Sequence, residues 1–375
     1  MKNRIGIVGG GQLGRMMAFS AKQLGFTVHV VDPTAQSPAG QVVDSQIVAD
    51  YKDQKAIKNL AKKSDFLTFE VELANADILN RLTKQGIKVN PSAKTLGIIK
   101  DKFAQKAFLR KHRISVADFA IVENKKEIEK YAKKYGYPFL LKARFDAYDG
   151  RGNFLVKNQN DISKGIEKLK ERKLYIEKNI PFVKELSIIV VRSINGNIVV
   201  YPVCETIHKR NICDVVIVPA PVSKNIKKKT ERLARKVMKS LKGAGAFGIE
   251  MFLTKKGNVL INEIAPRVHN SGHYTIEACI TSQFEQHIRA VTGLPLGSTE
   301  MKVPAAVMIN ILGERTGPSK LKGLKKTLTI PQVFVHVYGK METKIDRKMG
   351  HITALGKNIK DAYKKARLAR KYISI

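Results

Sequence analysis

The sequence is poor in cysteine and in long apolar segments. Its three cysteines, Cys204, Cys213 and Cys279, lack CxxC spacing and lie among apolar neighbours, so we expect reduced thiols in the core rather than zinc ligands or disulfides. No apolar run is long enough to span a membrane. The short apolar segment at residues 5–8 runs into glycines, which is not typical of a secretory signal, and we expect a cytoplasmic protein.

Acidic residues are also scarce, because 68 lysines and arginines face 32 aspartates and glutamates for a net charge of +36. Such a balance is expected of a protein that meets polyanions, which brings nucleic acid into consideration. The lysines are spread over nearly every expected helix, with modest runs such as 227–229, and no known nucleic-acid-binding motif accompanies them. We therefore favour a solvated basic surface that attracts small phosphorylated substrates over nucleic-acid binding.

The 375 residues, 43% hydrophobic and 27% charged, suit a globular protein of two or three domains. Arg4–Val8 and Thr27–Val31 have the composition of buried strands with an apolar helix between them, which predicts one βαβ unit of a parallel sheet. Residues 9–14 match GxGxxG and Asp32 ends the second strand, as in nicotinamide-dependent oxidoreductases. The same glycines let backbone amides approach any phosphate at a helix N-terminus, so the motif alone is weak.

A third strand is predicted at Phe66–Phe69, and it is followed by Glu70 and Glu72. Ligands bind at the carboxyl ends of strands in open α/β sheets, so these acids are expected near a ligand; a capped loop is the alternative. The pattern changes near residue 90, where a helix predicted over Lys94–Lys111 leads into a second unit. We predict domains at 1–100, 101–298 and 299–375.

The second unit begins with a strand at Phe139–Lys142, followed by YDGRGN at 148–153 and another strand through Val156. The segment lacks GK[ST] and a following helix, so it predicts a flexible hairpin flap over phosphates, with Arg151 able to reach them. A plain tight turn is the alternative. Further strands are predicted at 174–177, 185–191, 198–203 and 334–338, and helices at 230–241, 274–291 and 361–371.

Two acidic residues are predicted to face each other on one hairpin. Strands are expected at 247–254 and 259–264, and a two- or four-residue loop centred on 255–258 places Glu250 opposite Glu263. Two carboxylates about 5 Å apart repel each other unless a cation lies between them or one is protonated. This favours a magnesium site. A solvated hairpin face is the alternative, and a three-residue loop would break the pairing.

The run NEIAPRVHNSGHYT at 262–275 follows the end of the second strand. It brings together an acid, an arginine, histidines and amides, which is more reactive polarity than packing requires. We interpret residues 262–275 as an active-site wall.

Taken in order, these segments resemble the ATP-grasp ligases, and among them the 5-(carboxyamino)imidazole ribonucleotide synthases of purine biosynthesis. The resemblance spans nearly the whole chain. It implies an α/β protein with an ATP-grasp fold, an N-terminal Rossmann-like pre-ATP-grasp domain and a small C-terminal domain. The family-like phrases are GGGQLGRM at 9–16, DPTAQSPAGQVVD at 32–44, TFEVE at 68–72, YDGRGN at 148–153, NEIAPRVHNSGHYT at 262–275, SQFEQHIRAVTGLPLG at 282–297 and RKMGHIT at 347–353.

The resemblance implies ATP-dependent carboxylation of 5-aminoimidazole ribonucleotide with bicarbonate, through carboxyphosphate, giving the carboxyamino product, ADP and phosphate. It also implies Mg²⁺, with Mn²⁺ as a substitute, and a homodimer that binds neither nucleic acid nor membrane. A formate-dependent ATP-grasp ligase is the main alternative. A nicotinamide oxidoreductase leaves the acidic pair, the flap and the wall unexplained, and a non-enzymatic nucleotide or RNA binder requires the metal carboxylates to be inert.

The resemblance further implies roles for single residues. Arg267, His269 and Asn270 line the bicarbonate pocket, while Asp149 and Arg151 face the ribonucleotide, with Asp149 as the candidate base for the attacking amine. The metal ligands are Glu250 and Glu263. ATP is expected at Lys102, Lys142, Ala147, Tyr148, Asp149, Gly150, Arg151, Gly152, Asn153, Glu177, Lys178, Asn179, Ile180, Glu185, His208, Asn262 and Glu263, and the ribonucleotide at Gly11, Gln12, Leu13, Glu72, Tyr148, Lys340 and Arg347.

Overall fold

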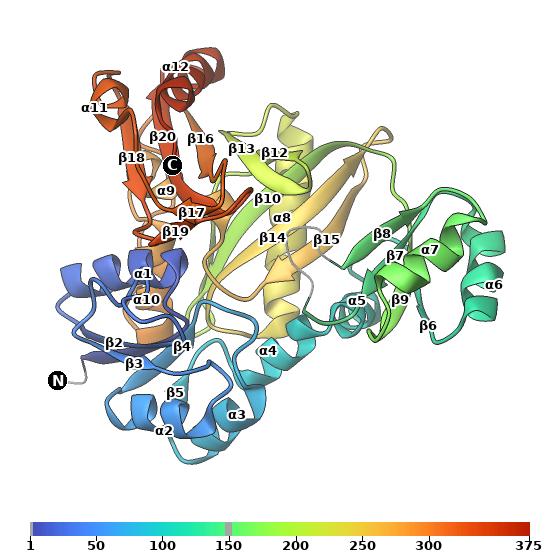
Figure 1. The fold of residues 1–375 in the computed structure, drawn as a ribbon, viewed down its shortest axis with the longest axis horizontal. Helices are drawn as coiled ribbons and strands as arrows, with labels where there is room; N and C mark the ends of the chain where they lie inside the picture. Colours follow the sequence, from blue (N-terminus) through green and yellow to red (C-terminus); the bar gives the residue numbers. More distant parts are fainter. Residues whose placement is uncertain (1–2, 147–151) are drawn as a thin grey trace.

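The computed structural model describes residues 3–146 and 152–375, and its N-terminal unit is a parallel sheet flanked by helices (Figure 1). The strands follow the order β3-β2-β1-β4-β5, and every pairing is parallel. The apolar side chains of β1 are buried on both faces, as expected of a strand inside a parallel sheet, so the predicted βαβ unit is confirmed. The elements are β1 (Arg4–Val8), α1 (Gln12–Gln23), β2 (Thr27–Asp32), β3 (Ser45–Val48), α2 (Gln54–Lys62), β4 (Phe66–Phe69), α3 (Ala76–Lys84) and β5 (Lys88–Val89).

The helix predicted over Lys94–Lys111 is in fact two helices. α4 (Ala93–Lys100) ends at Asp101, where the backbone is extended, with φ −93° and ψ 107°. The Asp101 carboxylate accepts hydrogen bonds from two amides in the first turn of α5 (Lys102–Lys111) and so caps it. The prediction of one helix was wrong because a capping aspartate starts a new helix inside a continuous helical pattern.

Residues 119–146 and 152–178 form a small lobe around an antiparallel sheet with the strand order β6-β9-β7-β8, seen at the right of Figure 1. Strands β7 and β8 form the predicted hairpin, in which Lys142 pairs with Asn153. The elements are β6 (Phe119–Val122), α6 (Lys125–Tyr135), β7 (Phe139–Ala143), β8 (Asn153–Val156), α7 (Asp161–Lys168) and β9 (Leu174–Lys178).

Over the described residues, the largest sheet has nine strands in the order β15-β14-β10-β12-β13-β16-β20-β18, with β11 beside β10. Strand β13 pairs with β16, so the sheet continues past residue 299, where the C-terminal unit is predicted to begin. The strands are β10 (Phe182–Arg192), β11 (Ile198–Val200), β12 (Cys204–Lys209), β13 (Ile212–Val218), β14 (Gly245–Thr254), β15 (Val259–Ala265), β16 (Ala305–Leu312), β18 (Val333–Val337) and β20 (Lys348–Gly356), and a separate pair is formed by β17 (Gly317–Pro318) and β19 (Glu342–Thr343).

The helix predicted at 274–291 is also broken. α9 (Thr275–Ala278) ends at Cys279, whose backbone is extended, and α10 (Gln283–Thr292) follows. The hydroxyl of Ser282 accepts a hydrogen bond from an amide in the first turn of α10, so a serine cap again explains the wrong prediction. The remaining helical elements are α8 (Lys224–Leu241), the 3-10 turn η1 (Asn270–Gly272), α11 (Leu324–Thr327) and α12 (Ile359–Tyr372).

The N-terminal unit packs on the central sheet through α1 and α10. The hydroxyl of Thr68, on β4, lies 2.7 Å from Nε2 of His287 on α10, and both side chains are buried. Cys204, Cys213 and Cys279 are buried free thiols, as predicted, and burial raises the pKa of Cys204 to about 12. In the described part of the chain, no helix is both long and apolar enough to cross a membrane.

Candidate active site

Glu250 on β14 and Glu263 on β15 lie directly opposite each other, as predicted, although the turn between the strands differs from the prediction. The amide of Thr254 donates to the carbonyl of Asn258 at 2.9 Å, so the turn holds three residues, 255–257. By itself this turn would break the pairing. A β-bulge at Asn262, which has no partner on β14, restores it. The expected loop length was therefore wrong, and the bulge preserves the acidic pair.

The two carboxyls are electrostatically unequal. Burial, and then the charge of Glu263, raise the pKa of the Glu250 carboxyl above its ordinary value. Burial alone would also raise the pKa of Glu263, but Lys102, whose Nζ lies 2.8 Å from Glu263 Oε2, outweighs it and brings that pKa below the ordinary value. Lys102 therefore offsets the repulsion between the two carboxylates at Glu263 but not fully at Glu250, which favours binding of a further cation at the pair.

The pair fits magnesium better than a metal held by protein ligands alone. Within residues 3–146 and 152–375, no group of three or more His, Cys, Asp or Glu side chains is placed to hold a metal ion. Magnesium is usually bound through one or two carboxylates together with substrate phosphates. The side chains of Glu250 and Glu263 remain 27% and 42% exposed, so both can reach a ligand.

Lys142 and Lys106 flank a buried carboxylate. Glu177 is 1% exposed, with Lys106 Nζ at 3.0 Å and Lys142 Nζ at 3.3 Å. Burial by itself would raise the pKa of Glu177, but the two ammonium groups outweigh it and lower that pKa. Sequence reasoning did not single out Lys106. The available signal was its place on the buried face of α5, where a lysine needs a partner.

The other predicted nucleotide residues lie where the small lobe joins the large sheet. Lys178 ends β9, and Asn179 and Ile180 lead from it into β10. On β10 and β12, Glu185 Oε2 lies 2.5 Å from His208 Nδ1. Burial lowers the pKa of His208, but the neighbouring carboxylate outweighs it, so the pKa is raised overall.

The wall connects two groups of predicted residues. One terminal nitrogen of Arg267 lies 2.9 Å from Oε1 of Glu72, so the expected bicarbonate pocket adjoins the expected ribonucleotide site. Arg267 Nε is buried without a hydrogen-bond partner among the described residues. Nε2 of His269 lies 3.6 Å from Glu250 Oε1. Burial, followed by the charge of Arg267, lowers the pKa of His269 well below its ordinary value.

Two fully buried amides hold the wall in place, and sequence reasoning missed both. The side chain of Gln283 accepts from His269 N at 2.9 Å and donates to His269 O at 2.7 Å. Asn310 and Asn270 exchange hydrogen bonds of 2.9 and 2.7 Å through their side-chain amides. Asn310 stands alone as a polar residue in the apolar strand β16, which was a signal for a buried polar partner.

The carboxylate of Glu70 is hydrogen-bonded to backbone amides of the glycine loop. It accepts hydrogen bonds from the backbone amides of Gly11 and Gly14, the latter at 2.6 Å, and a Cβ on Gly11 would lie 2.5 Å from Glu70 Oε1. Asp32 is 7% exposed and accepts from Gly10 N at 2.8 Å. Both acids thus bind the loop itself: Glu70 agrees with the capped-loop alternative, and Asp32 lacks the ligand-facing role that the GxGxxG pattern suggests.

The remaining predicted residues are scattered. Leu13 is 7% exposed and belongs to the core, while Gln12 is half-buried at the start of α1. Lys340 Nζ donates to the carbonyl of Lys348 at 2.7 Å, in the segment between β18 and β20. Arg347 is exposed in the same segment.

Part of the predicted flap can be placed. Gly152 has a φ of +109°, and its carbonyl accepts from the amide of Ala143 at 2.8 Å. The side-chain oxygen of Asn153 is buried and lacks a hydrogen-bond partner within the described residues. Five predicted residues, Ala147, Tyr148, Asp149, Gly150 and Arg151, lie outside the described residues.

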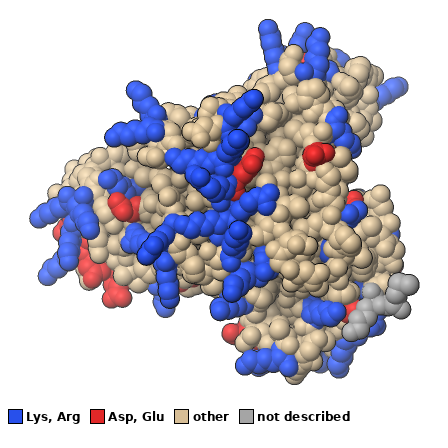
Figure 2. Space-filling view, turned by 180° about the vertical axis from the view of Figure 1, so that it is seen from behind, with Lys and Arg blue, Asp and Glu red and all other residues tan. Residues whose placement is uncertain are grey.

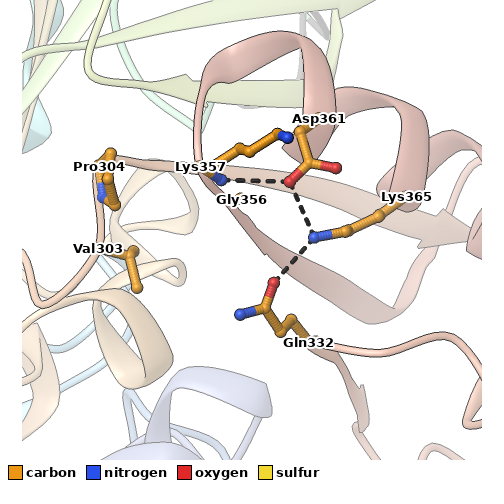
Figure 3. A pocket seen from close by; sticks show the side chains of 7 residues that line it. All are labelled: Val303, Pro304, Gln332, Gly356, Lys357, Asp361 and Lys365. Carbon is orange, nitrogen blue, oxygen red and sulfur yellow. Dashed lines mark hydrogen bonds and ion pairs between the residues drawn. The ribbon is translucent and has the colours of Figure 1, made fainter.

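Two hollows lie away from these residues. One, of about 450 Å³, is lined by α8 through five Lys and Arg side chains and Glu231, on the side of the molecule seen in Figure 2, where basic groups crowd the surface. The other, of about 490 Å³, appears in Figure 3. There Lys365 Nζ lies 2.9 Å from Asp361 Oδ2 and 2.8 Å from Gln332 Oε1, so these three side chains bind one another.

Three family models match the chain in sequence order: the ribonucleotide synthetase preATP-grasp domain at 1–100, the ATP-grasp domain at 107–284, and the phosphoribosylaminoimidazole carboxylase C-terminal domain at 306–365. The N5-carboxyaminoimidazole ribonucleotide synthase of Bacillus subtilis is 44% identical, over 93% of this chain and 90% of its own. The chain belongs to the N5-carboxyaminoimidazole ribonucleotide synthase family. The predicted family, ATP-grasp fold and enzyme class are therefore confirmed, and a nicotinamide oxidoreductase is ruled out.

Solved structures of N5-carboxyaminoimidazole ribonucleotide synthases have the same fold throughout. The Thermotoga maritima synthetase is 45% identical with a TM-score of 0.90, covering 99% of both chains. The Aspergillus clavatus synthase, solved with ADP and 5-aminoimidazole ribonucleotide, is 37% identical with a TM-score of 0.92, covering 99% of this chain and 98% of its own.

Yeast relatives of the family are longer than this chain. The phosphoribosylaminoimidazole carboxylases of Ogataea methanolica and Candida albicans are 46% and 44% identical over 95% and 96% of this chain. The chain spans 67% and 65% of their respective lengths, or about two thirds.

Proposed function

We propose that this chain carboxylates 5-aminoimidazole ribonucleotide with bicarbonate at the expense of ATP, in de novo purine biosynthesis. A bicarbonate oxygen attacks the γ-phosphorus as its bond to ADP breaks, giving carboxyphosphate. The exocyclic amine of the ribonucleotide then attacks the carboxyl carbon, phosphate leaves, and the amine loses a proton. The supporting observation is the opposed pair Glu250 and Glu263, with Lys102 against one member and the wall against the other.

We assign the triphosphate to the space bordered by Lys102, Lys142 and the β7–β8 hairpin. Lys142 lies on β7, beside the hairpin that carries the predicted flap, and Lys102 starts α5. Both ammonium groups are paired with carboxylates, Lys102 with Glu263 and Lys142 with Glu177, so they are held in place before a nucleotide arrives. Residues 177–180, Glu185 and His208 are assigned to the nucleoside, along the junction of the two sheets.

We assign Mg²⁺ to Glu250 and Glu263, with Asn262 beside them on the bulge. When bound, the ion supplies charge neutralisation on the β- and γ-phosphates. The protein holds the two carboxylates face to face and keeps Lys102 within 2.8 Å of one of them. Mn²⁺ is the expected substitute.

Arg267, His269 and Asn270 are assigned to bicarbonate and carboxyphosphate. Arg267 is fixed by Glu72, and its planar fork suits two oxygens of a carboxylate or phosphate. The neutral imidazole of His269 serves as a hydrogen-bond donor. Carboxyphosphate is short-lived in water, so these residues must bind it where solvent is excluded.

The ribonucleotide is assigned to Tyr148, Asp149, Arg151, Lys340 and Arg347. Glu72, held by Arg267, lies on the side of the wall that faces the N-terminal unit, which supports its place at the same substrate. Asp149 is assigned as the base that takes the amine proton. The backbone amide of Gly11 already donates to Glu70, so a contact between Gly11 and the ribonucleotide would use other atoms of Gly11.

Phosphate release measured with each substrate omitted in turn tests the proposed reaction. Turnover should require ATP, bicarbonate and aminoimidazole ribonucleotide together. Turnover that depends on formate in place of bicarbonate would favour the sister ligase, and ATP binding without any turnover would favour a nucleotide-binding protein.

We also propose domains at 1–100, 101–298 and 299–375, a homodimer, a cytoplasmic location, and no binding of nucleic acid. The family resemblance supports the dimer, and light scattering tests it. Limited proteolysis tests the domain limits, and cell fractionation tests the location. Electrophoresis with RNA at physiological salt tests the last point, because the net charge of +36 produces nonspecific binding at low salt.

A further inference from the structure

His269 is held in one orientation on the wall. Its ring packs against the backbone of β14 at Gly248, where an added Cβ would lie 2.4 Å from His269 Cβ and 2.5 Å from its Cγ. The side chain of Gln283 is hydrogen-bonded to both the backbone N–H and the backbone carbonyl of His269. The ring therefore presents fixed edges, with Nδ1 toward Ser271 and Nε2 toward Glu250.

The contacts of Nδ1 determine which ring nitrogen carries the proton. His269 caps η1, and its Nδ1 accepts from the backbone amide of Ser271 at 3.4 Å. A backbone amide can only donate, so Nδ1 must present its lone pair. The hydroxyl of Ser271, 2.9 Å from Nδ1, must then donate as well. A neutral imidazole has one N–H, and that proton therefore lies on Nε2.

A second serine completes this arrangement. Ser187 Oγ lies 2.7 Å from Ser271 Oγ, and both residues are buried, at 0% and 1% exposure. Because the Ser271 hydroxyl gives its proton to His269, its oxygen is left to accept from Ser187. Ser187 lies on β10 opposite Glu250 of β14, so the chain of hydroxyls starts on the strand next to the acidic pair.

We propose that Ser271, supported by Ser187, is a positioning residue that holds His269 as the Nε2–H tautomer. This inference rests on the proposed function for the role of His269. In that tautomer the N–H faces Glu250 Oε1, 3.6 Å away, and the space beside it where an acidic substrate is expected. The opposite tautomer turns a lone pair toward a carboxylate and an anionic intermediate, which is repulsive. His269 thus acts as a hydrogen-bond donor to carboxyphosphate, not as a base.

Nitrogen NMR of protein labelled with ¹⁵N-histidine tests the tautomer without any substrate. The signals of His269, one of eight histidines, are identified by their loss in His269→Gln. We expect Nδ1 to resonate as an unprotonated nitrogen and Nε2 as a protonated one at neutral pH. Ser271→Ala removes the 2.9 Å hydroxyl contact and leaves at Nδ1 only the longer, 3.4 Å contact from the backbone amide, so we expect part of the rings to shift to the Nδ1–H form and the spectrum to show a mixture of tautomers. A wild-type ring protonated on Nδ1, or an unchanged tautomer in Ser271→Ala, would overturn the proposal.

Kinetics supply the second readout. Removing the partner that orients a metal-binding histidine typically costs about 10- to 100-fold in affinity or activity, and we take the same range for a histidine that is oriented in the same way. We expect such a fall in kcat for Ser271→Ala, with the KM for ATP unchanged, and a smaller fall for Ser187→Ala. Ser193→Ala is the matched control, because Ser193 is also a buried serine but bonds Asn197 instead. A tautomer as expected with no turnover in the wild type would count against the proposed reaction while leaving the tautomer assignment standing.

Loss of folding in Ser271→Ala is detected by circular dichroism. If Ser271→Ala does not fold, Ser187→Ala tests the hydroxyl chain instead, since it removes the hydroxyl that donates to Ser271. An unchanged tautomer and an unchanged kcat in a folded Ser187→Ala protein would then overturn the supporting role of Ser187. The nitrogen spectrum of the wild-type protein would still show whether Nε2 of His269 carries the proton.

Discussion

Asn270 and Asn310 face each other through their side-chain amides, and each donates one hydrogen bond to the other. Asn310 also donates to the carbonyl of Cys213 at 2.8 Å and has no exposed surface. Asn270 belongs to the active-site wall, whereas Asn310 lies on β16 in the C-terminal part of the chain. That part therefore sets the orientation of a residue assigned to bicarbonate.

Replacing Asn310 by leucine should disturb both stability and the wall. Asn270 and the Cys213 carbonyl would lose their partners, and a buried unsatisfied group costs about 1–3 kcal/mol. We expect the free energy of unfolding in urea to fall by about that amount, and the KM for bicarbonate to rise. Asn158→Ala, at an exposed position, is the control. Unchanged values of both quantities would show that the amide pair has no such role.

The Glu263→Gln variant should lose turnover and keep its fold. The change removes one negative charge from the acidic pair at nearly constant shape, and it also weakens the 2.8 Å contact with Lys102. Phosphate release should be abolished while circular dichroism stays unchanged. Glu300→Gln, an exposed position, should remain fully active. Full activity in Glu263→Gln would refute the metal assignment.

In the Arg267→Lys variant, we expect ATP binding to be spared and the productive use of bicarbonate to fall. Lysine keeps the positive charge near Glu72 but loses the planar fork that holds two oxygens. The Kd for ATP, from calorimetry, should stay within error of the wild type, while kcat/KM for bicarbonate falls. An equal loss of ATP affinity would contradict the assignment of Arg267 to the bicarbonate pocket.

The Glu177→Gln variant should be strongly destabilised in a pH-dependent way. It leaves Lys106 and Lys142 buried without their partner, and breaking a buried ion pair costs about 3–5 kcal/mol. The pKa of Glu177 is lowered in the folded protein, so its stabilisation is present above the ordinary glutamate value of about 4.3 and is lost as pH falls through the folded value. Urea midpoints of the two proteins should converge in acid. A difference that stays constant from neutral to acidic pH would contradict this.

Local composition was enough to predict the acidic pair and about half of the strands, but β13, β16 and β20, among others, were not predicted. The βαβ unit at the N-terminus and the β7–β8 hairpin follow from apolar runs bounded by glycine-rich loops. The opposition of Glu250 and Glu263 was correct, but its reason was not. A three-residue turn and a compensating bulge at Asn262 give the same pairing as the expected even-numbered loop, and periodicity cannot distinguish these two solutions.

Features that depend on distant partners could not be read from local patterns. Glu70 directly follows a strand, a position where acids often face a ligand, but its carboxylate accepts hydrogen bonds from glycine amides far away in the chain. The breaks at Asp101 and Ser282 depend on single capping side chains inside helical patterns. Gln283 and Asn310 matter because of what they contact across the fold. The lone polar position in β16 indicated a buried partner for Asn310 but not which residue it is.

The unbroken sheet from β15 to β18 limits how the enzyme can move. Hydrogen-bonded strands join the acidic pair, His208 and the C-terminal strands into one stiff plate, so Glu250 and Glu263 move as one unit with the segment that bears Lys340 and Arg347. Bending between this plate and the small lobe is therefore confined to the connections between them, residues 112–118 and residues 179–181. Asn179 and Ile180 in the second connection are assigned to the nucleoside, so a proline or a disulfide placed there would change nucleotide binding as well as motion.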